Sequence, residues 1–220
     1  MPSVEFFFDY LSPYAYLAWS RIRGVCERRG AELIVSPVLL AGLLQHWGQL
    51  GPAEIPPKML FAFKDCARSA ILHGLPFRAP RFHPFNPLTA LRSSLSQVAG
   101  ADQPKVVDAL FQAGWGTGAD LGSSDTVARI LDRAGLDGEA LVVRAMLPAS
   151  KEALRAGTRR AVDNGVFGVP TMTVEGELFW GNDQLEHVDR RLSGDDPIAS
   201  IDLSALMPEG ASAERRRPKG

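Results

Sequence analysis

The chain has 220 residues, 45% of them hydrophobic, which is enough for one domain with a sizeable core or for two small ones. Its 24 basic and 25 acidic residues leave a net charge of −1, which argues against nucleic-acid and membrane partners. No apolar run approaches the ~20 residues of a bilayer span, and the N-terminus lacks a signal-peptide pattern. Because Cys26 and Cys66 suit a reducing compartment, we expect a soluble, cytoplasmic protein.

The first forty residues predict a strand, a helix and a second strand. Residues 3–9 are rich in aromatic and β-branched types and end at Asp9, as a buried strand would. Ser12-Pro13 has the form of a helix start, and Gly30 ends a helix of about 13–29. A second strand is predicted over about 32–38.

Helical periodicity replaces this pattern from residue 39 to residue 164, where turn signals indicate about six or seven helices. Strand signals return only at 171–175 and 178–180, with a hairpin turn at 175–177, and a last helix is predicted over 184–191. The long helical block is therefore interpreted as an insertion.

Residues 193–220 are rich in Ser, Asp, Pro and Gly and are predicted to form a flexible C-terminal tail. The tail ends in Glu-Arg-Arg-Arg-Pro-Lys-Gly, which could contact nucleic acid or lipid. A solvated terminus is the favoured interpretation, because the run is short and terminal.

Ser12 is the first candidate for chemistry. A hydroxyl at a helix N-terminus lies beside free backbone amides and the positive end of the helix dipole, which suits an anion. A serine that only caps the helix has the same pattern, and the local pattern alone favours this interpretation, because capping serines far outnumber catalytic ones.

Val169-Pro170 is the second candidate, because this pair directly precedes a predicted strand. Proline cannot donate to a sheet ladder, so its position indicates an edge or a special geometry. An ordinary turn proline is the alternative. We predict that the Val169-Pro170 bond is cis.

Four stretches then occur in a recognisable order: Phe8–Ala18, His83–Pro87, Phe167–Thr171 and Phe179–Asp183. In these four stretches the chain resembles the 2-hydroxychromene-2-carboxylate isomerase and kappa-class glutathione transferase family. This family is part of the disulfide-bond oxidoreductase A-like group of the thioredoxin superfamily. The resemblance implies an α/β protein, namely a thioredoxin fold with a large all-helical insertion between its β-α-β start and its β-β-α end. The implied parts are a thioredoxin-like domain of 1–38 and 165–192 and an inserted helical domain of 39–164. The resemblance also implies a homodimer.

Carried over residue by residue, the resemblance assigns a glutathione site. Ser12 and Ala15 stand where relatives have the cysteines of C-x-x-C, which excludes dithiol exchange through this loop. Ser12 would hold the glutathione sulfur, and Val169, before the cis-proline, would offer its backbone to the cysteinyl part. The resemblance further implies that Lys58 contacts the glycyl carboxylate and that Asp183 contacts the α-amino group. The γ-glutamyl end would lie against Trp180, Gly181 and Asn182, and Pro170 would complete the glutathione site. His83 and Phe85 would line a separate pocket for the acceptor substrate.

The chain departs from the isomerase branch at two positions. Where relatives place a lysine and an asparagine that contact an aromatic acid, this sequence offers Leu44 and Glu54. An acid needs a cation or hydrogen-bond donors, and Glu54 supplies neither, so the aromatic acid of the relatives is in doubt as the substrate.

The implied activity is a glutathione-dependent isomerisation of a small aromatic or electrophilic substrate. Ser12 and the helix N-terminus would lower the thiol pKa by about one to two pH units, and the thiolate would add reversibly to a conjugated carbon. The alternatives are a kappa-like glutathione transferase and a non-catalytic thioredoxin-like binding domain. A serine hydrolase built on Ser12 and Asp9 lacks the nucleophile elbow, and the four histidines lack metal-ligand spacing, so no metal is predicted.

Overall fold

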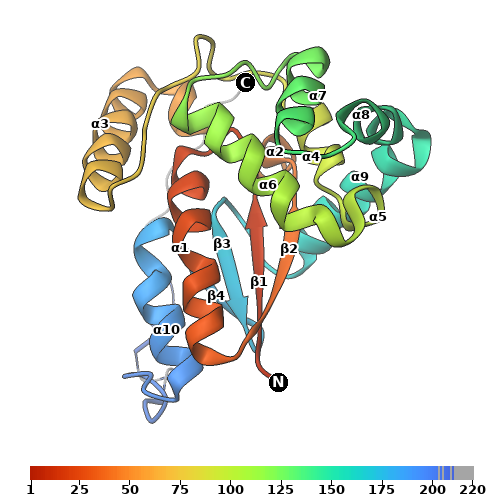
Figure 1. Ribbon diagram of the computed structural model, residues 1–220. Helices are drawn as coiled ribbons and strands as arrows, with labels where there is room; N and C mark the ends of the chain where they lie inside the picture. The colour runs from red at the N-terminus through yellow and green to blue at the C-terminus, as the bar shows by residue number, and fades with distance from the viewer. Residues whose placement is uncertain (203, 205, 209, 211–220) are drawn as a thin grey trace.

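A four-stranded mixed sheet lies at the centre of the molecule, in a computed structural model that describes residues 1–202, 204, 206–208 and 210 (Figure 1). The strand order is β2-β1-β3-β4. Strand β1 (Ser3–Phe8) pairs in parallel with β2 (Glu32–Pro37) and antiparallel with β3 (Thr171–Val174), which pairs antiparallel with β4 (Glu177–Trp180). This is the thioredoxin-like α/β fold that the sequence predicts.

The central strand β1 is buried on both faces, as its run of apolar residues predicts. Val4, Phe6 and Phe8 belong to the main hydrophobic core, whereas Phe7 packs in a smaller cluster on the opposite face of the sheet. Side chains alternate between the two faces of a strand, so a single strand joins both clusters.

Helix α1 (Pro13–Arg29) has the predicted bounds. It begins after the cap Ser12 and ends at Gly30, whose φ of 61° is the left-handed conformation that glycine adopts most easily. The β3–β4 turn is also confirmed, because Glu175 and Gly176 both have positive φ angles, as in a two-residue hairpin. The predicted cis bond at Val169-Pro170 is present, and His83-Pro84 is a second one.

Between β2 and β3 the described chain forms eight α-helices, where the sequence predicts six or seven. The count differs because one of them, α5, is a single turn that has no periodicity to detect. Figure 1 shows these helices gathered above and beside the sheet. They are α2 (Leu40–Trp47), α3 (Pro56–Leu72), α4 (Leu88–Ser93), α5 (Ser96–Ala99), α6 (Gln103–Phe111), α7 (Ser124–Arg133), α8 (Gly138–Met146) and α9 (Pro148–Asp163).

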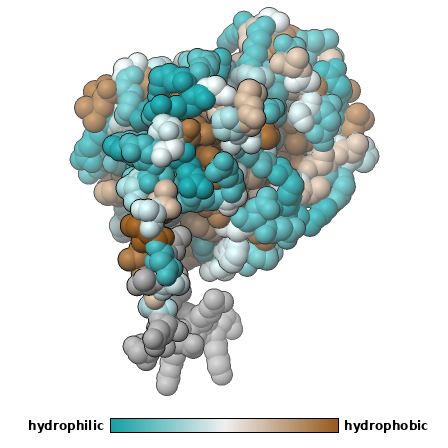
Figure 2. Space-filling model, turned by 90° about the horizontal axis from the view of Figure 1, so that it is seen from below, coloured by the Kyte–Doolittle hydropathy of each residue, from teal (hydrophilic) through white to brown (hydrophobic). Residues whose placement is uncertain are grey.

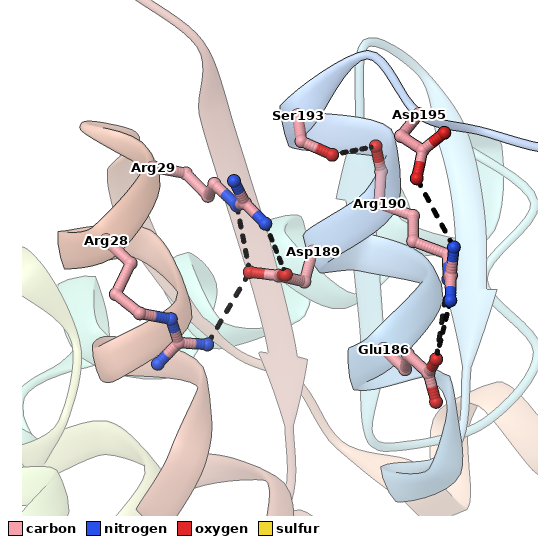
Figure 3. Close-up of polar contacts among 7 residues, drawn as sticks. All are labelled: Arg28, Arg29, Glu186, Asp189, Arg190, Ser193 and Asp195. Carbon is pink, nitrogen blue, oxygen red and sulfur yellow. Dashed lines mark hydrogen bonds and ion pairs between the residues drawn. The ribbon is translucent and has the colours of Figure 1, made fainter.

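The last helix, α10 (Leu185–Ser193), packs against α1 with the buried Leu185 and Val188, and ion pairs also join the two helices (Figure 3). Arg29 donates two hydrogen bonds to Asp189, at 2.6 Å from Nη2 and 3.0 Å from Nε, and Arg28 lies 3.5 Å from the same carboxylate. The hydrogen bond from Arg29 lowers the pKa of Asp189. These pairs join the two ends of the thioredoxin-like part.

Hydrophilic residues cover most of the face shown in Figure 2, and the hydrophobic ones form small separate groups. No helix among the described residues is long and apolar enough to span a bilayer. Cys26 and Cys66 are both free and buried. In the predicted flexible tail, residues 203, 205, 209 and 211–220, with the basic end, lie outside the described residues.

Candidate active site

The Ser12 loop, residues 9–12, connects β1 to α1. The Ser12 hydroxyl accepts a hydrogen bond from Ala15 N–H at 3.2 Å, so the capping interpretation is correct. The same hydroxyl donates to Val169 C=O, also at 3.2 Å, and the Ser12 side chain is almost completely buried. Its proton therefore already points to a partner outside the helix, on the segment before the cis-proline.

Unpaired backbone donors lie on both sides of this hydroxyl. Within the described part of the chain, the N–H groups of Tyr14 and Val169 have no hydrogen-bond partner. Pro13 has no N–H, so Tyr14 carries the first free amide of α1, where the helix dipole adds positive potential. This arrangement suits an anion placed near Ser12 and an extended peptide placed along Val169.

Trp180 lies beside the Val169-Pro170 segment. The N–H of Gly181 donates to Pro170 C=O at 3.0 Å, and the Trp180 ring packs edge-on against Phe167 with centroids 5.0 Å apart. A Cβ atom on Gly168 would lie 2.7 Å from the indole nitrogen of Trp180, so only glycine allows this approach. Trp180 is 54% exposed, so part of this residue is available to a ligand.

Asn182 and Asp183 form a turn of polar acceptors next to Trp180. Gly181 has a φ of 117°, and a Cβ there would collide with the Asp183 carboxylate. Asn182 is buried, and its Oδ1 has no partner within the described residues, while Asp183 is exposed and accepts from Gln184 at 3.1 Å. Such oxygens suit an ammonium group. This turn packs against α1, the helix that begins at Ser12.

Lys58 lies in the first turn of α3 and is exposed. Seven residues later on the same helix, Asp65 accepts a hydrogen bond from the Tyr14 hydroxyl at 2.9 Å. Residues seven apart share a helix face, so Lys58 lies on the face of α3 that is turned towards α1. No hydrogen bond or ion pair joins Lys58 to the Ser12 loop in the part of the chain described.

His83 contacts the Ser12 loop directly. Its Nε2 lies 2.9 Å from Leu11 C=O, and because a carbonyl only accepts, Nε2 carries the proton. Burial lowers the pKa of His83, and the Leu11 hydrogen bond opposes this in part. Its Nδ1 is buried with no partner among the described residues, and the Phe85 ring lies 6.3 Å away. His83 and Phe85 are thus together, as the resemblance implies, and His83 has a second contact that the sequence does not reveal.

Sequence reasoning misses the roles of Asp9, the first residue of the Ser12 loop, and of Trp115, which contacts this loop. The fully buried carboxylate of Asp9 accepts from Leu11 N–H at 2.9 Å and from Leu40 N–H at 2.8 Å. Burial raises the pKa of Asp9 to about 7, although both hydrogen bonds lower it. Trp115 donates to Tyr10 C=O at 2.8 Å. A polar residue ending a buried strand is a weak signal for Asp9, and no local pattern indicates Trp115.

Leu44 and Glu54, the two residues at which the chain departs from the isomerase branch, both lie close to Gly51 in the turn before α3. Glu54 accepts a hydrogen bond from Gly51 N–H at 2.6 Å, which closes the turn before α3. A Leu44 methyl group lies 3.1 Å from where a Cβ on Gly51 would be. Neither side chain therefore offers a cation or a donor at this turn.

Comparison with known proteins agrees with this geometry. The family model described as "DSBA-like thioredoxin domain" matches residues 3–193. A 2-hydroxychromene-2-carboxylate isomerase of Pseudomonas putida is 30% identical over 184 residues, which cover 83% of this chain and 90% of the relative. A glutathione S-transferase kappa 2 of Caenorhabditis elegans is 28% identical over 203 residues, which cover 84% of this chain and 89% of that relative. A solved 2-hydroxychromene-2-carboxylate isomerase superposes with a TM-score of 0.80 at 28% identity, covering 87% of this chain and 95% of that one.

Proposed function

Because this chain belongs to the DsbA-like family of 2-hydroxychromene-2-carboxylate isomerases and kappa-class glutathione transferases, we propose that it is a glutathione-dependent isomerase. The proposal rests on one observation above all: the Ser12 hydroxyl lies at the N-terminus of α1, between that helix and Val169 C=O. We further propose that the substrate is a small conjugated aromatic compound. Because Glu54 is held by Gly51 N–H, the substrate does not depend on a cation at that turn.

Glutathione fits the groups present. The free N–H and the C=O of Val169 match the two hydrogen bonds that an added peptide strand makes. The unpaired Oδ1 of Asn182 and the exposed carboxylate of Asp183 match the α-ammonium group, with Trp180 and Gly181 beside them. The C=O of Pro170 accepts a hydrogen bond from Gly181 N–H at 3.0 Å and so positions Gly181. In this proposal, Lys58 supplies the positive charge that pairs with the glycyl carboxylate of glutathione.

In this proposal, Ser12 turns its hydroxyl from Val169 C=O to the ligand sulfur, while Tyr14 N–H and the helix dipole add positive potential. A charge-assisted hydrogen bond contributes roughly 1.5–3 kcal/mol, which lowers a thiol pKa by about one to two pH units. Bound glutathione would supply a thiolate that adds reversibly to the substrate's conjugated double bond, so that rotation can occur before it leaves. His83, Trp115 and Leu40 hold the Ser12 loop, and His83 and Phe85 line the open side for the substrate.

The test replaces Ser12 with alanine and titrates the ultraviolet absorbance of the thiolate in the glutathione complex. Loss of the donor should raise the pKa of the bound thiol by about one pH unit, so activity should fall more at about pH 6.5 than at about pH 9. If Ser12 only caps α1, the variant loses ~1 kcal/mol of stability and the thiol titration is unchanged. An identical titration in both proteins would therefore refute the proposed role.

A glutathione transferase is the second candidate, favoured by the likeness to the kappa-class protein. It uses the same site with an electrophile that carries a leaving group. Turnover of chlorodinitrobenzene with release of chloride would support it, whereas isomerisation without consumption of glutathione would support the first candidate. Calorimetry tests the binding-domain alternative, which predicts no glutathione affinity.

The homodimer and the cytoplasmic location stay predictions. Light scattering after size-exclusion chromatography tests the homodimer directly.

A further inference from the structure

A cavity of about 620 Å³ lies between α2, α4 and α9. It shares no residue with the candidate glutathione site. Its size is within the range of ligand pockets in proteins, about 300–1,000 Å³. We refer to it as the cationic cavity, for the reason that follows.

The charged side chains that line the cavity are mostly basic. Arg92 comes from α4, and Lys151, Arg155 and Arg159 come from α9, against a single acid, Asp163. Arg159 is neutralised by Glu152 at 2.7 Å, and Arg155 lies 4.0 Å from the same carboxylate. Arg92 and Lys151 have no ion pair within the described residues. This excess of positive charge occurs in a chain whose net charge is −1.

Arg92 is the least satisfied of these groups. Its Nε is buried and has no hydrogen-bond partner among the described residues. Burial lowers the pKa of Arg92, and the neighbouring charge of Arg155 lowers it further. The Arg92 guanidinium thus loses water at its Nε and lies near a second positive charge, and an anion between Arg92 and Arg155 would offset both effects.

The rest of the wall is apolar. Leu39 from the start of α2, Leu88 from α4 and Leu154 from α9 line the cavity. The wall is also well supported, because Thr158 accepts from Leu39 N–H at 3.0 Å and donates to Leu154 C=O at 2.8 Å. A ligand that matches this wall has an apolar body as well as an anionic head.

We propose that the cationic cavity binds an amphipathic organic acid, with its carboxylate between Arg92 and Arg155 and its apolar body against Leu39, Leu88 and Leu154. Arginine suits a planar carboxylate, because its guanidinium donates two parallel hydrogen bonds. This site is separate from glutathione binding and does not depend on the proposed function.

The experiment titrates the full chain with decanoate in a calorimeter, below the concentration at which decanoate forms micelles. Saturable binding at one site is expected. Decanol has the apolar body without the charge and acetate has the charge without the body, so each should bind at least about tenfold more weakly. Equal binding of decanol and decanoate would overturn the proposal, because charge would then not select the ligand.

Arg155→Gln and Arg92→Met should each weaken decanoate binding about tenfold. Arg155 is exposed, so its variant keeps the test valid even if Arg92→Met does not fold. Arg129→Gln, an exposed arginine on α7, is the matched control and should bind as the wild type does. Glutathione affinity should stay unchanged in all three variants.

Two further outcomes would overturn the proposal. One is decanoate binding that is unchanged in both cavity variants. The other is no decanoate binding by the wild type. If the cavity variants then also change their oligomeric state in light scattering, a second copy of the chain covers the cavity.

Discussion

Single residues of the Ser12 loop combine roles that a sequence pattern treats as alternatives. Ser12 is a helix cap through its hydroxyl oxygen and a donor to Val169 through its hydroxyl proton. A serine hydroxyl has one donor and two acceptor sites, so both contacts exist together. Capping and ligand binding therefore do not exclude each other at this position.

Asp9→Asn should change how stability depends on pH. The pKa of Asp9 is about 7 in the folded protein and about 3.9 in an unfolded chain, so between these values the folded state keeps a proton that the unfolded state releases. Wild-type stability should therefore fall as the pH rises from about 4 to about 7, relative to the variant. Urea unfolding of both proteins across this range measures the difference.

Glu186→Gln is the control for Asp9→Asn, since Glu186 is an exposed carboxylate on α10. The change in the slope of stability against pH that Asp9→Asn produces should exceed the change that Glu186→Gln produces. Parallel curves for the wild type and Asp9→Asn would show that Asp9 does not titrate in this window.

At the scale of elements, α10 completes the thioredoxin-like part by docking on α1 after a long detour of the chain. The contact includes an ion pair at Asp189, which accepts from Arg29 and lies near Arg28 (Figure 3). Arg190 instead pairs with Glu186 and Asp195, close to it in sequence. Of these ion pairs, those of Asp189 join α10 to α1, whereas those of Arg190 do not reach another helix or strand.

Asp189→Asn should destabilise the protein at neutral pH but not in strong acid. The pKa of Asp189 is lowered in the folded state, so its stabilising effect is complete above about pH 4 and is lost as the pH falls through the folded value. Thermal unfolding at several pH values measures this. Glu186→Gln, which removes an i,i+4 pair on the surface, should have a smaller effect at neutral pH. A wild-type advantage of the same size at every pH would contradict the ion-pair explanation.

At the scale of the whole molecule, the chain between β2 and β3, its helices and the segments that connect them, holds the loop that the sheet and α1 present. It supplies Leu40 N–H to the Asp9 carboxylate, Trp115 to Tyr10 C=O and His83 to Leu11 C=O. The main core also contains residues of both parts, such as Phe8 and Phe111, whose rings lie 5.4 Å apart. Shared packing of this kind predicts a single cooperative unfolding transition.

Trp115→Phe tests whether the helical part prepares the candidate site. The variant leaves Tyr10 C=O without its donor, which should cost about 1–3 kcal/mol of stability and reduce glutathione affinity. Trp19→Phe is the matched control, because Trp19 is also buried but donates to Asp108 at 2.7 Å, away from the loop. The control should lose stability and keep its glutathione affinity. Equal glutathione affinity in both variants would show that the helical part does not prepare the candidate site.

The sequence by itself determined the features that depend on near neighbours along the chain. These are the bounds of α1, its cap at Ser12, the hairpin at Glu175-Gly176 and the buried strand β1, because capping, turn geometry and periodicity act over a few residues. The resemblance added the expectation that Ser12 and Val169 belong to one site.

Only the tertiary structure decided the contacts between distant residues. Ser12 and Val169 are 157 positions apart, and Trp115 is 105 positions from Tyr10, so no local pattern determines either distance. The raised pKa of Asp9 and the charge of the cationic cavity likewise depend on burial and on neighbours from several helices. These properties arise when the helices pack against the sheet, because packing decides which polar groups lose water and which partners they meet.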